Sequence, residues 1–345
     1  MKIGLISTAV PLVQGGGRFI VDWLHEKLRE RGHAVEVVYI PYTDELEHIL
    51  PQMVSIRLMK LDDYFDRVIT IRPPAHMVQH PCKVVWFIHH LRIFYDLWQT
   101  PYCPVLDDAS GRAMRAAVMA ADNVALGEAQ RVFTNSRVVG ERVRRFNNVD
   151  SEVLYPPVLR PDMFRAGDYG EEIVSVCRME HHKRQHMLIE AMAHTRTSVR
   201  LRLCGTSSNP DYILMLHDIA RRLGVEDRIT FEVRWITEEE KAERLENALA
   251  SAYLPFDEDS YGYPTIEAAH ARRCTVTVSD SGGVSEFVTD GVTGFVTDPH
   301  PGAVAHVFDR LYADRALARH LGGRACERVA ELGIDWDTVV RRLLE

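Results

Sequence analysis

The residues of this chain best suited to chemistry are acids grouped around the expected start of a helix. A short apolar run, Ser251 to Pro255, is followed by three carboxylates, a Tyr-Gly-Tyr turn and Pro264, a residue that suits the first turn of a helix. Glu267 is then expected in the first helical turn, where the helix dipole favours a carboxylate. Because a carboxylate accepts two hydrogen bonds, Glu267 suits a vicinal diol such as that of a ribose.

Asp259 precedes Glu267 with seven residues between them, so it is expected on the loop just ahead of the helix. From there its carboxylate can reach the hydroxyls of another ring. Two such acceptors on one rim indicate a pocket for a nucleotide sugar. The alternative is a cluster of solvated acids at a helix start, which the spacing alone does not exclude.

Two cations follow another expected strand. Arg178 and Lys183 stand five residues apart, directly after the strand pattern Val-Ser-Val-Cys. We expect this loop at the carboxyl edge of a parallel sheet, where ligands bind such folds. An arginine offers a bidentate fork and a lysine a point charge, so the pair suits a diphosphate. A solvated basic loop is the alternative.

Glycines mark one further candidate anion site and stand again in a later turn. Gly15, Gly16 and Gly17 form the candidate site ahead of the first expected helix, and Gly282 and Gly283 follow an expected strand. Without a Cβ atom, glycines let backbone N–H groups approach a phosphate, and a helix N-terminus adds partial positive charge. The first set lacks the Gly-x-Gly-x-x-Gly spacing and no acid ends the next strand, which argues against a nicotinamide or flavin cofactor. Ordinary loop and turn glycines are the alternative for both sets.

Histidines offer one candidate site residue and one cluster. His89 ends an expected strand, where an imidazole can donate a hydrogen bond or titrate near neutral pH, although lone histidines are more often structural. His181, His182 and His186 have no Cys/His spacing or His-Glu-x-x-His pattern beside them. We therefore expect no metal site.

Strand and helix patterns alternate through both halves, which is typical of parallel doubly wound sheets. In the first half the expected strands are residues 2–7, 34–40, 67–71, 83–89 and 132–135, and in the second half they are 172–177, 200–204, 228–234, 251–254 and 275–278. Thr237 with Glu240 predicts a capping box, and Gly224 predicts a helix end. The proline-rich stretch Tyr155 to Pro161 is a plausible semi-rigid linker.

Length and composition agree with two domains. A chain of 345 residues exceeds what one core usually holds, so we expect a first Rossmann-like domain at 1–158, joined by a terminal amphipathic helix at 335–345, and a second at 159–334. The formal net charge of −8 argues against nucleic acid as the main partner. Six scattered cysteines indicate reduced thiols, and the absence of a signal peptide or membrane-spanning run indicates a cytoplasmic protein.

The acidic segment resembles a known signature. Asp259-Ser-Tyr-Gly-Tyr-Pro-Thr-Ile-Glu267-Ala268 is similar to the Glu-Gly-Phe-Gly-x-Pro-x-x-Glu-Ala text of retaining glycosyltransferases of the GT-B fold, family 4 (glycosyl transferases group 1). Arg178 to Lys183 is similar to the family's Gly-Arg-x-x-x-x-Lys-Gly element, and Ser281 to Glu286 to its Gly-Gly-x-x-Glu turn. Together with the first glycine loop, His89 and the terminal helix, these matches run in the family's order across nearly the whole chain.

The sequence differs from the family motifs at three positions. Asp259 replaces the first Glu of the signature, and Glu258 can supply that carboxylate instead if the loop is shifted by one residue. Cys177 and Arg184 replace the glycines that flank the basic element. The geometry of both loops is therefore open at this point.

The resemblance implies a GT-B fold with two Rossmann-like domains facing across a cleft, and a C-terminal helix that returns to the first domain. It also implies a metal-independent, retaining transfer of a sugar from a nucleoside diphosphate sugar to a hydroxyl of a glycan, lipid-linked or small-molecule acceptor, without a cofactor. The implied catalytic residues are His89, Arg178, Lys183, Asp259 and Glu267. The implied donor-binding residues are Gly16, Gly17, Arg178, Lys183, Glu258, Asp259, Tyr261, Gly262, Glu267, Gly282 and Gly283.

Other functions share this fold. An epimerase or phosphorylase acting on related substrates, or a non-catalytic protein that binds a nucleotide sugar, would carry the same architecture. Four arginines, Arg137, Arg142, Arg144 and Arg145, either give a weak contact with an anionic membrane or form a solvated helix face. The nucleotide base, the sugar, the acceptor, the linkage and the oligomeric state are not predicted.

Overall fold

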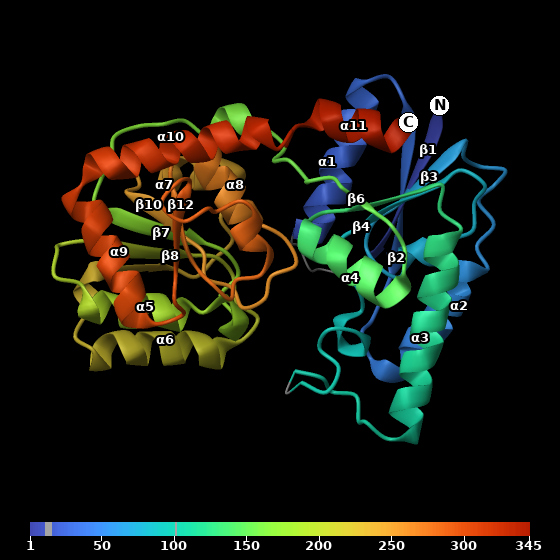
Figure 1. The fold of residues 1–345 in the computed structure, drawn as a ribbon, viewed down its shortest axis with the longest axis horizontal. Helices are drawn as coiled ribbons and strands as arrows, with labels where there is room; N and C mark the ends of the chain where they lie inside the picture. Colours follow the sequence, from blue (N-terminus) through green and yellow to red (C-terminus); the bar gives the residue numbers. More distant parts are fainter. Residues whose placement is uncertain (11–15, 101) are drawn as a thin grey trace. The chain divides into compact units, whose positions relative to one another are not determined.

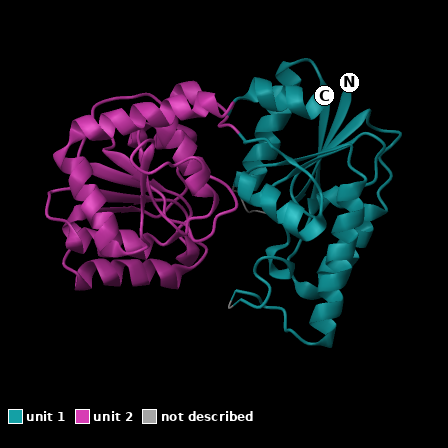
Figure 2. Cartoon of the chain, in the orientation of Figure 1, with its two compact units in different colours: residues 1–156, 334–345 teal, residues 157–333 magenta. Residues whose placement is uncertain are grey.

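The computed structural model describes residues 1–10, 16–100 and 102–345, and the chain divides into two compact units (Figures 1 and 2). Unit 1 comprises Met1–Pro156 and Ile334–Glu345, and unit 2 comprises Pro157–Gly333. The boundaries expected from the sequence lie close to these positions. The expected linker stretch, Tyr155 to Pro161, contains the junction between the units.

Unit 1 is built on a parallel sheet with the strand order β2-β1-β3-β4-β5-β6 (Figure 1). Its strands are β1 (Lys2–Ala9), β2 (Ala34–Pro41), β3 (Arg67–Thr70), β4 (Lys83–Phe87), β5 (Arg131–Thr134) and β6 (Glu152–Val153). Its helices are α1 (Gly16–Glu30), α2 (Leu46–Arg57), α3 (Ala109–Gly127), α4 (Arg137–Asn147) and α11 (Trp336–Leu344). Every residue of β4 is buried, as expected of a central strand covered on both faces.

The C-terminal helix α11 belongs to unit 1, as the resemblance implied. It packs against α1 with Trp336, Val339, Val340 and Leu343 buried. Arg31 on the chain after α1 forms an ion pair with Asp337, and Arg67 Nη1 donates to the Leu343 carbonyl at 2.8 Å. The helix is thus held by apolar burial and by polar contacts at both of its ends.

Unit 2 repeats the arrangement with the strand order β12-β11-β10-β7-β8-β9, again all parallel. Its strands are β7 (Glu172–Val176), β8 (Arg200–Cys204), β9 (Ile229–Glu232), β10 (Ala250–Ala252), β11 (Thr275–Val278) and β12 (Gly294–Thr297). Its helices are α5 (Gln185–His194), α6 (Pro210–Arg222), α7 (Glu238–Glu246), α8 (Tyr263–His270), α9 (Pro301–Ala313) and α10 (Arg315–Glu331). A cluster of buried apolar side chains, with Ile173, Leu201 and Val276 among its members, joins this sheet to its helices.

Two sequence signals for the ends of helices are confirmed. The Thr237–Glu240 capping box starts α7, and Gly224, with φ at +66°, follows the end of α6. Two strands were not expected from the sequence, β6 and β12. The first is only two exposed residues long, and the second begins with a glycine and is buried only over its first two residues, so neither gives a clear apolar pattern.

Two expectations about the whole chain can be compared with the structure. All six cysteines lie in the described part of the chain and are free, with Cys204 and Cys274 buried. Among the described residues, no helix is both long and apolar enough to cross a membrane.

Candidate donor site in unit 2

The two cations predicted to bind a diphosphate differ in their exposure and in their partners. Arg178 follows β7, is half-exposed, and its Nη1 donates to Glu180 Oε1 at 2.7 Å. Lys183 ends a short 3₁₀ helix, His181–Lys183, and its side chain is only 9% exposed. Its ammonium donates to the Tyr253 hydroxyl at 3.0 Å and forms an ion pair with Glu258.

Arg184 takes the place of the glycine that the family motif carries after its lysine. Its φ of +57° lies in the left-handed region that favours glycine. The side chain offsets this strain through hydrogen bonds: Nε donates to the Leu254 carbonyl at 2.6 Å, and the guanidinium forms a two-pronged ion pair with Asp280. The departure from glycine therefore preserves the turn and ties it to the loops after β10 and β11.

Of the two acids considered for the first position of the motif, Glu258 and Asp259, Glu258 forms the ion pair with Lys183. Burial raises the pKa of Glu258, but the Lys183 ammonium and the hydrogen bond that Tyr253 donates at 2.8 Å outweigh burial and lower the pKa below its usual range. Glu258 is therefore ionised at neutral pH and neutralises the cation expected to hold a diphosphate. Asp259 is half-buried on the same loop.

Gly282 and Gly283 have a packing role that was not predicted from the sequence. A Cβ on Gly282 would lie 2.4 Å from the Glu258 carbonyl oxygen, and one on Gly283 would lie 2.7 Å from Ser260 Cα. The Gly283 amide donates to the Glu258 carbonyl at 2.8 Å. These glycines let the acidic loop pack on the turn after β11, and the Gly283 amide is already engaged within the chain. Their proposed contact with a donor phosphate stays a prediction.

Gly283→Ala is expected to lower the free energy of unfolding by about 1–3 kcal/mol, because the new methyl group has to push the loop at Ser260 aside. The matched control is Gly323→Ala in the interior of α10, where an added Cβ meets no atom within 4 Å. This control should stabilise the protein by about 0.5–1 kcal/mol through helix propensity. Urea denaturation of both variants measures the difference, and equal effects would contradict the packing role of Gly283.

Tyr261 and Gly262, two more predicted donor contacts, lead into α8. Tyr261 is fully buried, with its ring centroid 6.2 Å from that of Phe287. Gly262 has a φ of +72°, and a Cβ there would lie 2.3 Å from the Tyr253 ring. Both residues therefore fix the start of the helix, and a contact of either with a donor stays a prediction.

Glu267 lies in the second turn of α8, so its expected place in the first turn was wrong. The helix begins at Tyr263 after Gly262, Pro264 occupies its first turn, and no acid stands there. The Glu267 side chain is 1% exposed. Helix-dipole stabilisation falls off beyond the first turn, so the charge of Glu267 needs another source of support.

Lys241 on α7 gives that support, and sequence reasoning missed it. Its ammonium lies 2.9 Å from Glu267 Oε1 and 2.7 Å from Glu238 Oε1, and Lys241 is buried. A signal was present in the sequence. Lys241 stands four residues before Leu245, so it shares the apolar face of its helix, where a lysine needs a buried acid as partner.

The predicted residues of unit 1 lie at the ends of β4 and the start of α1. Gly16 and Gly17 are in the first turn of α1 rather than on a loop ahead of it, and Gly15 lies outside the described residues. A Cβ on Gly17 would meet Ile88 Cδ1 at 3.3 Å. Gly17 thus lies beside the residue that precedes His89.

His89 is a neutral imidazole at physiological pH. It is half-buried with its Nδ1 2.7 Å from the His90 carbonyl oxygen, which accepts a hydrogen bond if Nδ1 carries the proton. Burial lowers the pKa of His89 to about 4, although the His90 carbonyl acts in the opposite direction. The neutral form can accept or donate one hydrogen bond through Nε2.

We expect the His89 ring not to titrate between pH 5.5 and 8 in an NMR experiment, because its folded pKa lies below its unfolded value of about 6.5. The unfolded state then binds more protons between these two pKa values, so the contribution of His89 to stability is complete above pH 6.5 and is lost as the pH falls toward 4. Comparison with His89→Gln assigns the ring signal. A midpoint near 6.5 would contradict the burial of this group.

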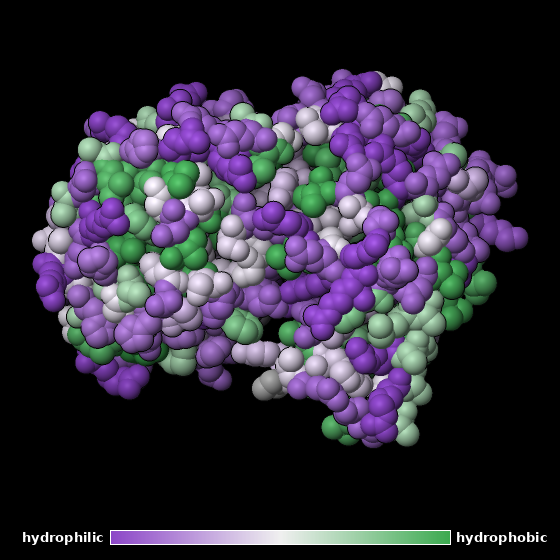
Figure 3. Space-filling view, viewed as in Figure 1, coloured by the Kyte–Doolittle hydropathy of each residue, from purple (hydrophilic) through white to green (hydrophobic). Residues whose placement is uncertain are grey.

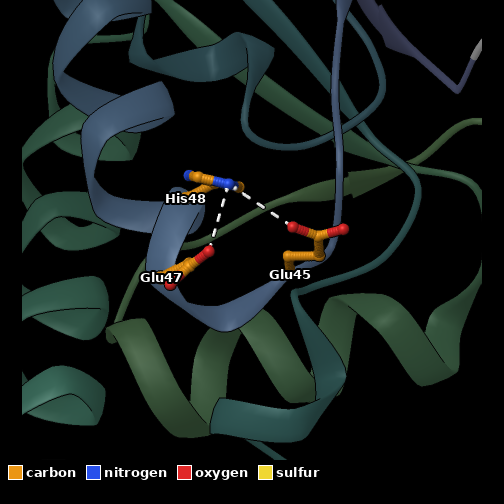
Figure 4. A group of neighbouring side chains, drawn as sticks. All are labelled: Glu45, Glu47 and His48. Carbon is orange, nitrogen blue, oxygen red and sulfur yellow. Dashed lines mark ion pairs between the residues drawn. The ribbon is translucent and has the colours of Figure 1, made fainter.

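Histidines of the cluster at residues 181–186 contact one another through their rings. The rings of His181 and His186 stack at 5.0 Å. Within the described residues, the one group with metal-ligand spacing is Glu45, Glu47 and His48 at the start of α2, all exposed and joined by two ion pairs of 3.4 Å (Figure 4). None of the predicted site residues belongs to it.

Figure 3 shows hydrophilic residues over α4, where the four arginines lie. Arg144 forms an ion pair with Asp150, and Arg142 lies 3.5 Å from Asp96. These acids neutralise part of the basic face. Membrane contact by this helix stays a prediction.

Known proteins resemble parts of this chain. The family model "Glycosyl transferases group 1" matches residues 165–328, which lie within unit 2. D-inositol 3-phosphate glycosyltransferase of Nocardia farcinica is 28% identical over 64% of this chain and 52% of its own. The alpha-1,3/1,6-mannosyltransferase ALG2 of Dictyostelium discoideum is 30% identical over 36% of this chain and 29% of its own. The chain thus spans about half or less of the length of these two curated relatives.

Solved structures match over nearly the whole chain. Sucrose-phosphate synthase from Thermosynechococcus elongatus has a TM-score of 0.79 at 18% identity and covers 99% of this chain and 97% of its own. Anabaena HepE in complex with UDP and glucose has a TM-score of 0.72 at 17% identity, covering 99% and 98%. The likeness confirms the expected GT-B class of fold, with two Rossmann-like domains in one chain.

Proposed function

We propose that this chain is a glycosyltransferase, since the family model of glycosyl transferases group 1 matches residues 165–328. It transfers a sugar from a nucleoside diphosphate sugar to a hydroxyl group of an acceptor. The observation that carries this proposal is the pairing of a buried cation, Lys183, with the acid Glu258 at the carboxyl edge of the unit 2 sheet, followed by the buried acid Glu267 on α8. This set offers one group for a diphosphate and one for a ribose.

Lys183 and Arg178 are the proposed ligands of the diphosphate. As the bond between the sugar C1 and the diphosphate oxygen breaks, negative charge grows on the leaving group, and a fixed cation in a water-poor site stabilises it. The low exposure of Lys183 supports the larger share for this residue. Arg178 is half-exposed and paired with Glu180, so it suits the outer phosphate.

Retention of the anomeric configuration is the proposed stereochemical course. The acceptor oxygen bonds to C1 on the face that the diphosphate leaves, and its proton passes to a phosphate oxygen of the leaving group. Asp259 or Glu258 is the proposed contact of the donor sugar. The role of His89, a residue of unit 1, stays a prediction from the family resemblance. The proposal requires no metal ion and no cofactor.

A uridine diphosphate sugar is the first donor class to test, since the neighbour HepE binds UDP and UDP-glucose. A thermal-shift screen of the full chain against UDP, GDP and ADP should show a raised Tm with one of them. A ligand at 100 times its Kd stabilises the folded state by about 2.7 kcal/mol. If none of the three nucleotides raises the Tm, the proposed function is wrong.

A further inference from the structure

The ion-pair partner of Glu267 is one buried lysine, Lys241. Lys241 Nζ lies 2.9 Å from Glu267 Oε1, and among the described residues no other ion pair of Glu267 is formed. Lys241 is 9% exposed and Glu267 1% exposed, so water screens neither charge well. A carboxylate buried this deeply without a cation would take up a proton.

The same ammonium is shared with a second acid, which fixes its position. Glu238 Oε1 lies 2.7 Å from Lys241 Nζ, three residues earlier on α7. The capping box of Thr237 and Glu240 holds the first turn of this helix in place. Lys241 therefore approaches Glu267 from a fixed direction rather than as a mobile surface side chain.

Burial and neighbouring charges act in opposite directions on the pKa values of Glu267 and Lys241. Burial raises the pKa of Glu267, the Lys241 ammonium opposes this, and Glu238 adds to it, so the pKa remains above its usual range. Burial lowers the pKa of Lys241, but the two carboxylates outweigh burial and raise it. The lysine therefore stays charged, and its charge opposes the protonation of Glu267.

The contact leaves part of the carboxylate for a ligand. Lys241 occupies Glu267 Oε1, and among the described residues no hydrogen bond reaches Oε2. Oε1 also keeps a second lone pair. An ionised carboxylate held in one rotation can accept from both hydroxyls of a diol, whereas a protonated one would present a donor to one of them.

We propose that Lys241 is a positioning residue for the ribose-binding carboxylate: its ammonium fixes the rotation of Glu267 and favours negative charge on it, and so sets the preference of the site for nucleotides with intact 2′ and 3′ hydroxyls. This inference rests on the proposed function. A purely structural lysine would stabilise the fold without affecting that preference. The two roles are therefore separable by a ratio of affinities.

The experiment measures calorimetric Kd values of the full chain for UDP, GDP and ADP and for the 2′,3′-dideoxy form of each. The quantity of interest is the ratio of the dideoxy Kd to the ordinary Kd for the nucleotide that binds. Lys241→Met keeps an unbranched apolar side chain, one atom shorter, but removes the charge. We expect its ratio to fall by about tenfold relative to the unmodified chain, since hydrogen bonds to a charged acceptor are the stronger ones. Lys241→Arg restores the charge and should recover most of the ratio.

The matched control is Arg202→Met, which removes another partly buried cation of unit 2. Arg202 lies on β8, with Nε 2.7 Å from Glu172 Oε2 and an ion pair to Glu232. This control should lower stability but keep the ratio. If Lys241→Met does not fold, Lys241→Gln, which can still donate to both acids, serves in its place and should also lower the ratio.

The outcomes separate the two hypotheses. If none of the nucleotides binds the unmodified chain, the proposed function fails and the role of Lys241 fails with it. If a nucleotide binds with a clear ribose preference and the charge-removing variants keep the same ratio, only the role of Lys241 is overturned. A lowered ratio in Lys241→Met that Lys241→Arg does not restore would also contradict it.

Discussion

Lys183→Ala should reduce sugar transfer by about 10²- to 10³-fold, the loss typical of removing one preorganised donor to a developing charge. The affinity for the nucleoside diphosphate should fall at least about tenfold, because a charge-assisted contact is lost and the partly buried Glu258 is left as an uncompensated anion beside the phosphates. The free nucleoside carries no phosphate, so its affinity should not change. Calorimetric titration with both ligands measures the difference.

Two further variants separate binding from stability. Lys183→Ala breaks a partly buried ion pair, so it should also lower the Tm. The double variant Lys183→Met with Glu258→Gln removes both charges and should recover much of the Tm without recovering nucleotide affinity. Lys60→Ala, an exposed position in unit 1, should behave as the unmodified chain. Normal nucleotide affinity in Lys183→Ala would remove this residue from the site.

Glu267→Gln should weaken binding of the nucleoside diphosphate by about 10- to 100-fold, because an amide has one acceptor oxygen where the carboxylate has two. The same variant should bind the 2′,3′-dideoxy nucleotide as the unmodified chain does, since that ligand has no diol. The effect on kcat/KM for transfer should be of similar size, because this binding is used in the transition state as well.

The dideoxy nucleotide is the internal control for this variant. Glu267 lies next to Lys241, so a loss of affinity for both nucleotides would point to a local packing defect rather than to a lost ribose contact. Equal affinity of Glu267→Gln and the unmodified chain for the ordinary nucleotide would contradict the ribose assignment.

The strands and their order of appearance followed from apolar runs, because a parallel sheet covered on both faces requires them. β8 and β11 have the expected bounds, and the ends of the others shift by a few residues. β6 escaped detection because two exposed residues carry no such pattern. Which strands pair depends on contacts between residues far apart in the sequence. The spacing of residue types along the chain does not predict these contacts.

The site was only partly predictable for a related reason. Spacing identified Lys183 and Glu267 as candidates but could not show that Glu258 pairs with Lys183, a contact between residues 75 apart. The sequence shows a glycine at position 283, but it does not show that the loop at Ser260 packs against this glycine. The turn of α8 that holds Glu267 depended on Gly262 as the residue before the helix, and one residue of difference in the start moved the acid beyond the first turn.

Arg184 shows how a departure from a motif can preserve its geometry. A left-handed arginine is rare, yet its hydrogen bonds to Asp280 and to the carbonyls of Leu254 and Pro255 replace the conformational freedom of glycine. The sequence showed the substitution but not these partners, which lie about 70 and 96 positions away along the chain.

The central claim is that unit 2 holds a nucleoside diphosphate between Lys183 and Glu267. A crystal structure of the chain with the nucleotide that raises its Tm tests it most directly. We expect a phosphate oxygen within hydrogen-bond distance of Lys183 Nζ in place of the Glu258 carboxylate, and the ribose hydroxyls on Glu267. A nucleotide bound elsewhere, with the Lys183–Glu258 ion pair intact, would contradict the account.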